Sequence, residues 1–209
     1  MLIIACVCVG ERYGDEYVTR LRDGVARNLK DEHRFVALTD RQIEGVECVP
    51  VPPMLEGWWA KLWLFAPGVF PDGSRVLYFD LDTVITGNLS AHAAYAGDFA
   101  ILRDFYRPLG MGSAVMSWVA GACDDIWDQW LCFGAPRFAG GDQKWIEIAR
   151  PNADRWQDMM PGKTVSYKAD CGDGPPPSAS VVCFHGLPRP HQVNGWAHDL
   201  WLGRQLEIA

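Results

Sequence analysis

The sequence predicts a mixed α/β fold, in which a mostly parallel sheet is flanked by helices. Leu2–Val9 is an apolar run of strand length without polar alternation, as expected for a strand that is covered on both faces. Asp15–Leu29 follows with apolar residues at helical spacing. His33–Thr39 is a second apolar run. The three segments form a strand–helix–strand unit, which favours parallel pairing.

The rest of the chain continues this pattern of strands and helices. Further strands are predicted at Gly45–Val51, Ser74–Phe79, Asp98–Leu102, Ala114–Trp118, Val165–Lys168 and Val181–Phe184. Helical segments are predicted at Glu56–Phe65, Cys123–Phe133 and Asp142–Ala149. Cys171–Ser180 is rich in Gly and Pro and is predicted to be a loop.

Length and composition indicate one globular domain over residues 1–209. The chain is 49% hydrophobic and 22% charged, an ordinary globular balance, and no polar linker divides it. The net charge of −7 argues against a nucleic-acid-binding protein, which would need a basic face.

The cysteines and the N-terminus indicate a cytoplasmic protein. Seven cysteines occur, an odd number without a C-x-x-C pair, so no zinc cluster is predicted and the thiols suggest a reducing compartment. The apolar N-terminus lacks a basic leader and is too short to span a membrane. We therefore expect no transmembrane segment.

Polar residues recur directly after the apolar strands. Gly10-Glu11, Thr39-Asp40, Asp80 with Asp82, and His185 all occupy such positions. Ligands of open α/β sheets bind outside the carboxyl ends of the strands. The recurrence predicts one shared cleft.

Asp80 and Asp82 are the strongest functional signal. They follow the apolar run V-L-Y-F. Residues two apart on an extended chain point to the same side, roughly 6.5–7 Å apart. Two hard carboxylate ligands suit Mg²⁺ or Mn²⁺, which would neutralise a diphosphate leaving group. The alternative is that both carboxylates only cap a following turn.

Other functions remain open at this stage. The segment D-L-D-T-V also resembles haloacid-dehalogenase-like phosphatases, in which Asp80 would be the nucleophile and Asp82 the general acid/base. Its position midway along the chain and the missing Gly after Asp82 argue against this alternative. A nucleotidyltransferase would need a Gly-rich basic loop, of which G-E-R-Y-G is a poor version. A non-catalytic nucleotide-sugar-binding protein is a third possibility.

Six blocks of sequence together resemble the GT-A glycosyltransferases. They are most similar to the glycogenin and galactosyltransferase-like group, glycosyltransferase family 8. The blocks are I-I-A-C-V-C-V-G-E-R-Y, G-W-W-A-K-L-W-L-F-A-P, R-V-L-Y-F-D-L-D-T-V-I, G-S-A-V-M-S-W, G-G-D-Q and C-F-H-G-L-P-R-P-H. The resemblance implies a GT-A nucleotide-diphospho-sugar transferase fold.

The resemblance and the positions after strands together suggest roles for individual residues. Asp142 and Gln143 would be catalytic and face the donor sugar and the acceptor. Donor binding would involve Tyr13, Asp40, Lys61, Asp80, Ser113 and Arg189. Asp80, Asp82 and His185 would bind Mn²⁺ or Mg²⁺. The chain departs from the family pattern in two places: Ser113 replaces an Asn, and Arg189-Pro190 follows His185 two residues early.

The sequence therefore predicts a metal-dependent hexosyltransferase. It would move a hexose from a nucleotide diphosphate sugar, most simply a UDP-sugar, to the hydroxyl of a glycan or other acceptor. The resemblance implies retention of the anomeric configuration. Ten tryptophans occur; most are expected in the core, and one or two are expected to line the acceptor site.

Overall fold

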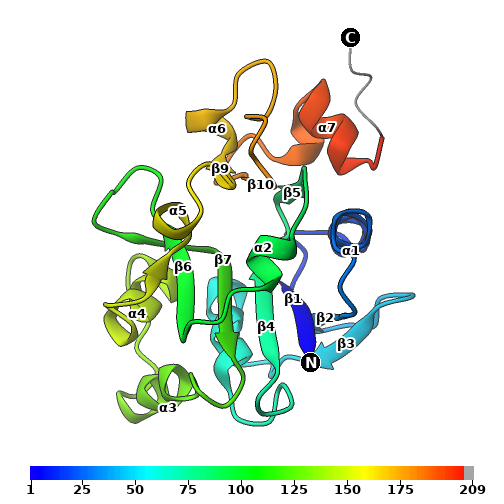
Figure 1. The fold of residues 1–209 in the computed structure, drawn as a ribbon. Coiled ribbons are helices and arrows are strands. Elements are labelled where there is room, and N and C mark those ends of the chain that lie inside the picture. Colours follow the sequence, from blue (N-terminus) through cyan, green and yellow to red (C-terminus); the bar gives the residue numbers. More distant parts are fainter. Residues whose placement is uncertain (205–209) are drawn as a thin grey trace.

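A seven-stranded sheet forms the centre of the computed structural model, which describes residues 1–204 (Figure 1). Its order is β3-β2-β1-β4-β7-β6-β8. The strands are β1 (Leu2–Cys8), β2 (Arg34–Thr39), β3 (Glu47–Pro50), β4 (Arg75–Phe79), β6 (Phe99–Arg103), β7 (Met111–Val119) and β8 (Asp154–Arg155). Only β7 runs antiparallel to its neighbours β4 and β6. The predicted mixed, mostly parallel sheet flanked by helices is confirmed.

The central sheet has a hydrophobic core on each face. Successive side chains of a strand point to opposite faces, and β1 uses both. Ile4 and Cys6 face a core that includes α1 (Asp15–Asn28). Ile3 and Ala5 face a second core built with η1, α3 and α4. These helices are Gly57–Phe65, Asp125–Cys132 and Gly141–Ala149.

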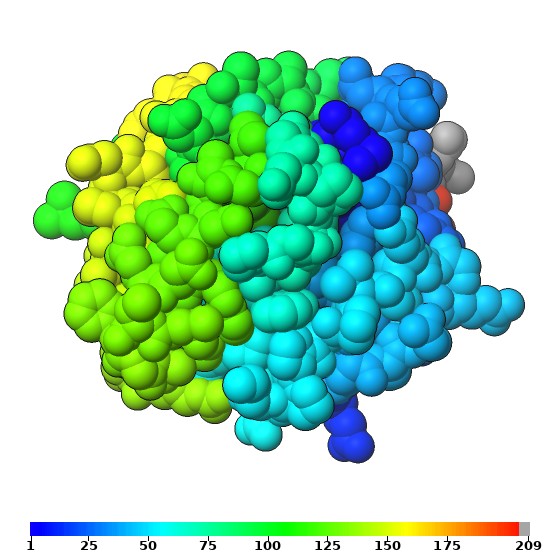
Figure 2. All heavy atoms as spheres, turned by 90° about the horizontal axis from the view of Figure 1, so that it is seen from below, coloured from blue at the N-terminus to red at the C-terminus, as the bar shows by residue number. Residues whose placement is uncertain are grey.

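A smaller sheet lies beyond the carboxyl ends of β1 and β4. It has the order β5-β10-β9, from Thr83–Ile85, Val181–Cys183 and Thr164–Ser166. Figure 1 shows it together with α6 (Tyr167–Asp170) and α7 (Trp196–Trp201) at the end of the molecule opposite to the N-terminus. The view from below in Figure 2 shows the blue, cyan and green segments and almost none of the orange C-terminal part. The C-terminal part thus covers the strand ends where ligands bind in such folds.

Two predicted elements differ from the structure. Val165–Lys168 is not one strand: β9 ends at Ser166, whose side chain accepts a hydrogen bond from the Ala169 backbone and caps α6. Glu56–Phe65 is helical as predicted, but Gly57–Phe65 winds as a 3₁₀ helix.

The other predicted strands and helices are found with shifted ends, and short elements were missed. The missed ones are β5, β8, α2 (Ser90–Ala93), α5 (Trp156–Met159), α6, η2 (Pro190–Gln192) and α7. None of the helices in residues 1–204 combines the length and apolar character that a membrane span requires.

His92 connects α2 to the smaller sheet. Its ring is fully buried against Trp156, and Nε2 is hydrogen-bonded to Thr164 Oγ1 of β9 at 2.8 Å. Burial, with a smaller effect from Lys163, lowers the pKa of His92 from its ordinary 6.5 to about 4. The folded protein therefore holds a neutral imidazole.

The buried imidazole makes stability depend on pH. The unfolded chain takes up a proton at His92 near pH 6.5, whereas the folded chain resists protonation down to pH 4. His92 therefore lowers the free energy of unfolding by about 3 kcal/mol as the pH falls through this window. Urea unfolding from pH 7 to 4 should show this loss in the parent protein. The variant His92→Gln should lack it, and parallel pH profiles would contradict the assignment.

Candidate active site

A cavity of about 570 Å³ lies between the carboxyl end of β4 and the smaller sheet. Its size is typical of a small-molecule site. The predicted residues that line it are Tyr13, Lys61, Asp80, Asp82, Ser113, Asp142, Gln143 and His185. Asp40 and Arg189 are the predicted residues outside it. Their roles toward a ligand stay predictions.

Asp80 is placed by the β4–β7 pairing. Its backbone N–H donates to Ala114 O at 2.8 Å, which extends the ladder by one residue. Because Tyr78 and Asp80 are two residues apart, they share the face of the sheet that η1 covers. Tyr78 Oη donates to Asp80 Oδ1 at 2.6 Å, and Lys61 Nζ of η1 lies 2.7 Å from the same oxygen. The packing of η1 on the sheet therefore places Lys61 at the carboxyl end of β4.

Lys61 joins two carboxylates from different elements. Its Nζ lies 3.6 Å from Asp142 Oδ2 and donates to Ser113 Oγ at 3.1 Å, and Ser113 donates to Asp142 at 2.7 Å. The Lys61 and Asp142 side chains are only 12% and 5% exposed. Burial alone would lower the pKa of Lys61, but Asp142 and Asp80 outweigh burial and raise it. Burial raises the pKa of Asp142, and Lys61 opposes this.

Asp82 occupies a different environment, although it is only two residues further along the chain. The backbone turns after Asp80, with Thr83 N–H donating to Asp80 O at 3.1 Å. Asp82 Oδ2 accepts a hydrogen bond of 2.7 Å from Tyr13 Oη. Burial and then the Asp80 carboxylate raise the pKa of Asp82 to about 6. Burial and then Asp82 also raise the pKa of Tyr13. No Lys or Arg side chain within residues 1–204 forms an ion pair with this carboxylate.

His185 reaches the cavity through the smaller sheet. β10 pairs antiparallel with β5, which follows Asp82 directly, and Phe184 N–H donates to Asp82 O at 3.2 Å. His185 Nε2 is hydrogen-bonded to Ser166 Oγ at 2.7 Å. The ring lies near Phe105 and Tyr106, with centroids 5.6 and 5.0 Å away. Burial, assisted by Lys168, lowers its pKa and favours the neutral ring.

The residues fit a divalent cation in part. Asp80 and Asp82 offer oxygen ligands beside each other. Burial and then the Asp80 carboxylate raise the pKa of Asp82, and a nearby cation would favour its charged form. In residues 1–204, however, no three His, Cys, Asp or Glu side chains converge as a metal site. His185 Nε2 is hydrogen-bonded to Ser166 Oγ in this structure, and its role as a metal ligand stays a prediction. Mg²⁺ commonly uses one or two carboxylates together with substrate phosphates, so the two aspartates remain a suitable donor pair.

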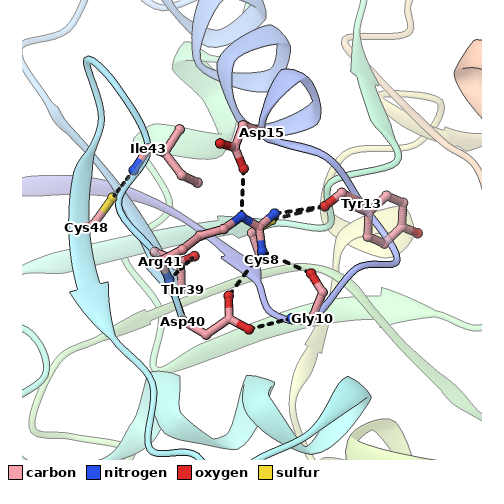
Figure 3. Close-up of polar contacts among 9 residues, drawn as sticks. All are labelled: Cys8, Gly10, Tyr13, Asp15, Thr39, Asp40, Arg41, Ile43 and Cys48. Atoms are coloured by element: carbon pink, nitrogen blue, oxygen red, sulfur yellow. Dashed lines mark hydrogen bonds and ion pairs between the residues drawn. The ribbon is translucent and has the colours of Figure 1, made fainter.

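Asp40 holds a loop in place together with its neighbour Arg41, as Figure 3 shows. Asp40 accepts hydrogen bonds from Gly10 N–H at 2.7 Å and from Arg41 at 3.1 Å. Arg41 also donates to Asp15 at 2.7 Å and to the carbonyls of Gly10 and Tyr13, both at 2.9 Å. This network fixes the loop after β1 that carries Tyr13.

A second cavity of about 550 Å³ adjoins the first. Asp40 and Arg41 line it, and Val9 and Gly57 line both cavities. The single predicted cleft is therefore two neighbouring cavities.

Arg189 lies beside the cavity. Its guanidinium is 4.7 Å from the Tyr13 ring centre and donates to Arg12 O at 3.3 Å. Sequence reasoning missed several cavity residues: Arg12, Tyr78, Asp104 and Tyr106. Trp58 also lines the cavity, and it is one of the tryptophans of which one or two were expected at an acceptor site. Tyr78 could have been predicted from its spacing to Asp80. Asp104 could have been predicted from its place after a strand. Arg12 and Tyr106 carry no pattern in the sequence.

The sheet order and the cavity at the strand ends define a glycosyltransferase fold of the GT-A type, and solved structures agree. The chain aligns with the galactosyltransferase LgtC in complex with donor and acceptor sugar analogs, at a TM-score of 0.66 and 12% identity over 98% of this chain and 97% of that one. For the glycosyltransferase GlyE of Streptococcus pneumoniae TIGR4, the TM-score is 0.69 at 11% identity over 98% and 60%.

A third structure extends this agreement to a larger protein. The bifunctional glycosyltransferase WbbM in its apo form gives a TM-score of 0.70 at 10% identity, over 97% of this chain and 49% of that one. The sequence matches no protein-family model, and no curated protein matches it. The predicted fold is confirmed by the comparison of structures, whereas the two comparisons of sequence give no match.

The buried lysine should be essential for stability. Lys61→Met leaves Asp80 and Asp142 without their cation, and we expect the free energy of unfolding to fall by about 3 kcal/mol. Lys144→Met is the control, since Lys144 is 44% exposed and pairs with Glu147 at the surface. It should cost less than about 1 kcal/mol. Equal losses in urea titrations of the two variants would refute the buried network.

Proposed function

We propose that this chain is a metal-dependent glycosyltransferase that moves a hexose from a UDP-sugar to an acceptor hydroxyl, with retention of anomeric configuration. One observation carries the proposal: Asp80, Asp82, Lys61 and Asp142 converge in one cavity at the strand ends of a glycosyltransferase fold. The block I-I-A-C-V-C-V-G-E-R-Y resembles the uridine-binding first strand and loop of glycosyltransferase family 8, which supports UDP as the nucleotide.

We place such a donor across the two adjoining cavities. The nucleoside would occupy the cavity beside Asp40, and the diphosphate and sugar would extend past Tyr13 into the larger one. Arg189 lies beside Tyr13 without a carboxylate partner in the described part of the chain, so it is available to a diphosphate. Phosphates favour such unpaired guanidinium groups.

Asp80 and Asp82 would hold a Mn²⁺ or Mg²⁺ ion, with His185 as a further candidate ligand. Bound there, the ion would supply positive charge to the departing diphosphate. In the transfer, the bond between the anomeric carbon and the diphosphate oxygen breaks, and a bond to the acceptor oxygen forms. The acceptor proton passes to the departing diphosphate.

The chain's own residues would mainly position the reactants. Lys61 fixes Asp142 at the base of the cavity, and Asp104 Oδ2 accepts a hydrogen bond of 3.2 Å from Gln143 Nε2. Asp142 and Gln143 would then contact the donor sugar and the acceptor hydroxyl in a fixed geometry. Orientation of this kind contributes strongly to group-transfer rates.

We also propose that the protein acts in the cytoplasm. All seven cysteines are free thiols in the structure. Free thiols favour a reducing compartment, which supports the cytoplasm.

Activity should depend on metal and on Asp82. We expect UDP release from one or more UDP-sugars in the presence of Mn²⁺, loss of that release with EDTA, and a decrease of roughly 100-fold or more in kcat for Asp82→Asn. The exposed Asp72→Asn is the matched control and should behave like the parent. Turnover that continues unchanged in EDTA would refute the metal-dependent mechanism.

The same preparations separate the alternatives. A phosphatase would hydrolyse simple phosphate esters and form a hydroxylamine-sensitive phosphoaspartate at Asp80. A non-catalytic binding protein would bind UDP and Mn²⁺ in calorimetric titrations without turnover. UDP and Mn²⁺ binding that is unchanged in Asp82→Ala would exclude the proposed site.

A further inference from the structure

Trp58 differs from every other tryptophan of the chain. All ten tryptophans lie within the described residues, and nine of them are buried or half-buried. The side chain of Trp58 is 57% exposed, and it lines the larger cavity. The neighbouring Trp59 is buried and stacks on Trp130 in the core. Core packing therefore explains Trp59 but not Trp58.

The Trp58 ring is held against the backbone at the start of α4. A Cβ atom on Gly141 would lie 3.1 Å from Trp58 Cε3. Gly141 also has a φ of +59°, a conformation that favours glycine. This contact places the indole against the residue that precedes Asp142 in the chain. The exposed aromatic surface and Asp142, which the proposed function assigns to the acceptor, line the same cavity.

Polar groups surround this aromatic surface. The Arg12 guanidinium lies 5.9 Å from the centre of the Trp58 ring, and no carboxylate in residues 1–204 pairs with it. Asp104, Asp142 and Gln143 line the same cavity. The site therefore combines an open apolar ring with hydrogen-bonding groups of both kinds, donors and acceptors.

A sugar ring has the complementary chemistry. One face of a pyranose presents C–H groups that an indole can cover, while its edge carries hydroxyls that donate and accept hydrogen bonds. A purely aromatic or alkyl alcohol would use the ring but leave most of the polar groups without partners, and unpaired polar groups cost affinity. The combination favours a saccharide over a simple alcohol.

We propose that Trp58 is the stacking surface for the acceptor, and that the acceptor is a saccharide whose pyranose ring lies on the indole beside Asp142. This assignment of the substrate class rests on the proposed function. It makes Trp58 a determinant of acceptor specificity, with no part in donor binding.

Transfer kinetics provide the first test. The probes are methyl β-glucopyranoside, methyl β-galactopyranoside and disaccharides, with phenol and butanol as non-sugar acceptors. Trp58→Ala should raise the KM for the best saccharide about tenfold, the expected value for one lost stacking contact. The KM for the donor and acceptor-independent donor hydrolysis should not change. Trp58→Phe should keep most of the affinity, and the control Phe133→Ala, which changes a 72% exposed ring outside the cavity, should match the parent.

A binding measurement separates this inference from the proposed function. Saturation-transfer NMR detects contact between the same saccharides and the protein without a donor. Saccharide signals that disappear in Trp58→Ala, in a protein that turns over no donor, would support the acceptor site while refuting the transferase. Equal saccharide signals or equal KM values in the parent and Trp58→Ala would overturn the inference. Preference for phenol or butanol over every saccharide would also overturn it.

Discussion

The pairing of Lys61 with Asp80 and Asp142 is the interaction on which the rest of the site depends. The three residues come from η1, the end of β4 and the start of α4, so one buried cation connects three separate elements. A lysine placed among apolar neighbours would be costly without these partners, and the carboxylates would be costly without the lysine. The packing of both helices on one face of the sheet is therefore coupled to the geometry of the cavity floor.

The two aspartates of the D-L-D segment have unequal surroundings, and this difference has a chemical consequence. Asp80 has a lysine and a tyrosine as partners, whereas the Asp82 side chain, among the residues that the structure describes, is hydrogen-bonded only to the Tyr13 hydroxyl. The negative charge of the Asp80 carboxylate is thus partly neutralised, whereas that of the Asp82 carboxylate is not. A protein that binds an ion together with a diphosphate needs such an arrangement, because full internal neutralisation would remove the attraction for the ion.

Sequence reasoning located the fold and the floor of the cavity because both depend on local patterns. The unbroken apolar strands predicted a sheet covered on both faces, and the V-L-Y-F run placed Asp80 at a strand end. Reasoning was weaker where distant segments decide the outcome. The three residues of β5 become a strand only by pairing with β10, and Asp40 is engaged by Gly10 and Arg41 across a neighbouring loop. The Trp58 indole lies against Gly141, and no spacing rule in the sequence connects these two residues.

The small sheet also sets an order in which the site is completed during synthesis. Thr83–Ile85 leaves the ribosome early, but its partner Val181–Cys183 is translated much later. Until then the loop that carries Asp82 lacks the strand that fixes it, and the apolar side chains of β5 lack their cover. Closing so long a loop is slow relative to local helix formation. The nascent chain therefore carries a nearly complete central sheet whose cavity end is unfinished, and exposed apolar surface of this kind is what chaperones and proteases engage.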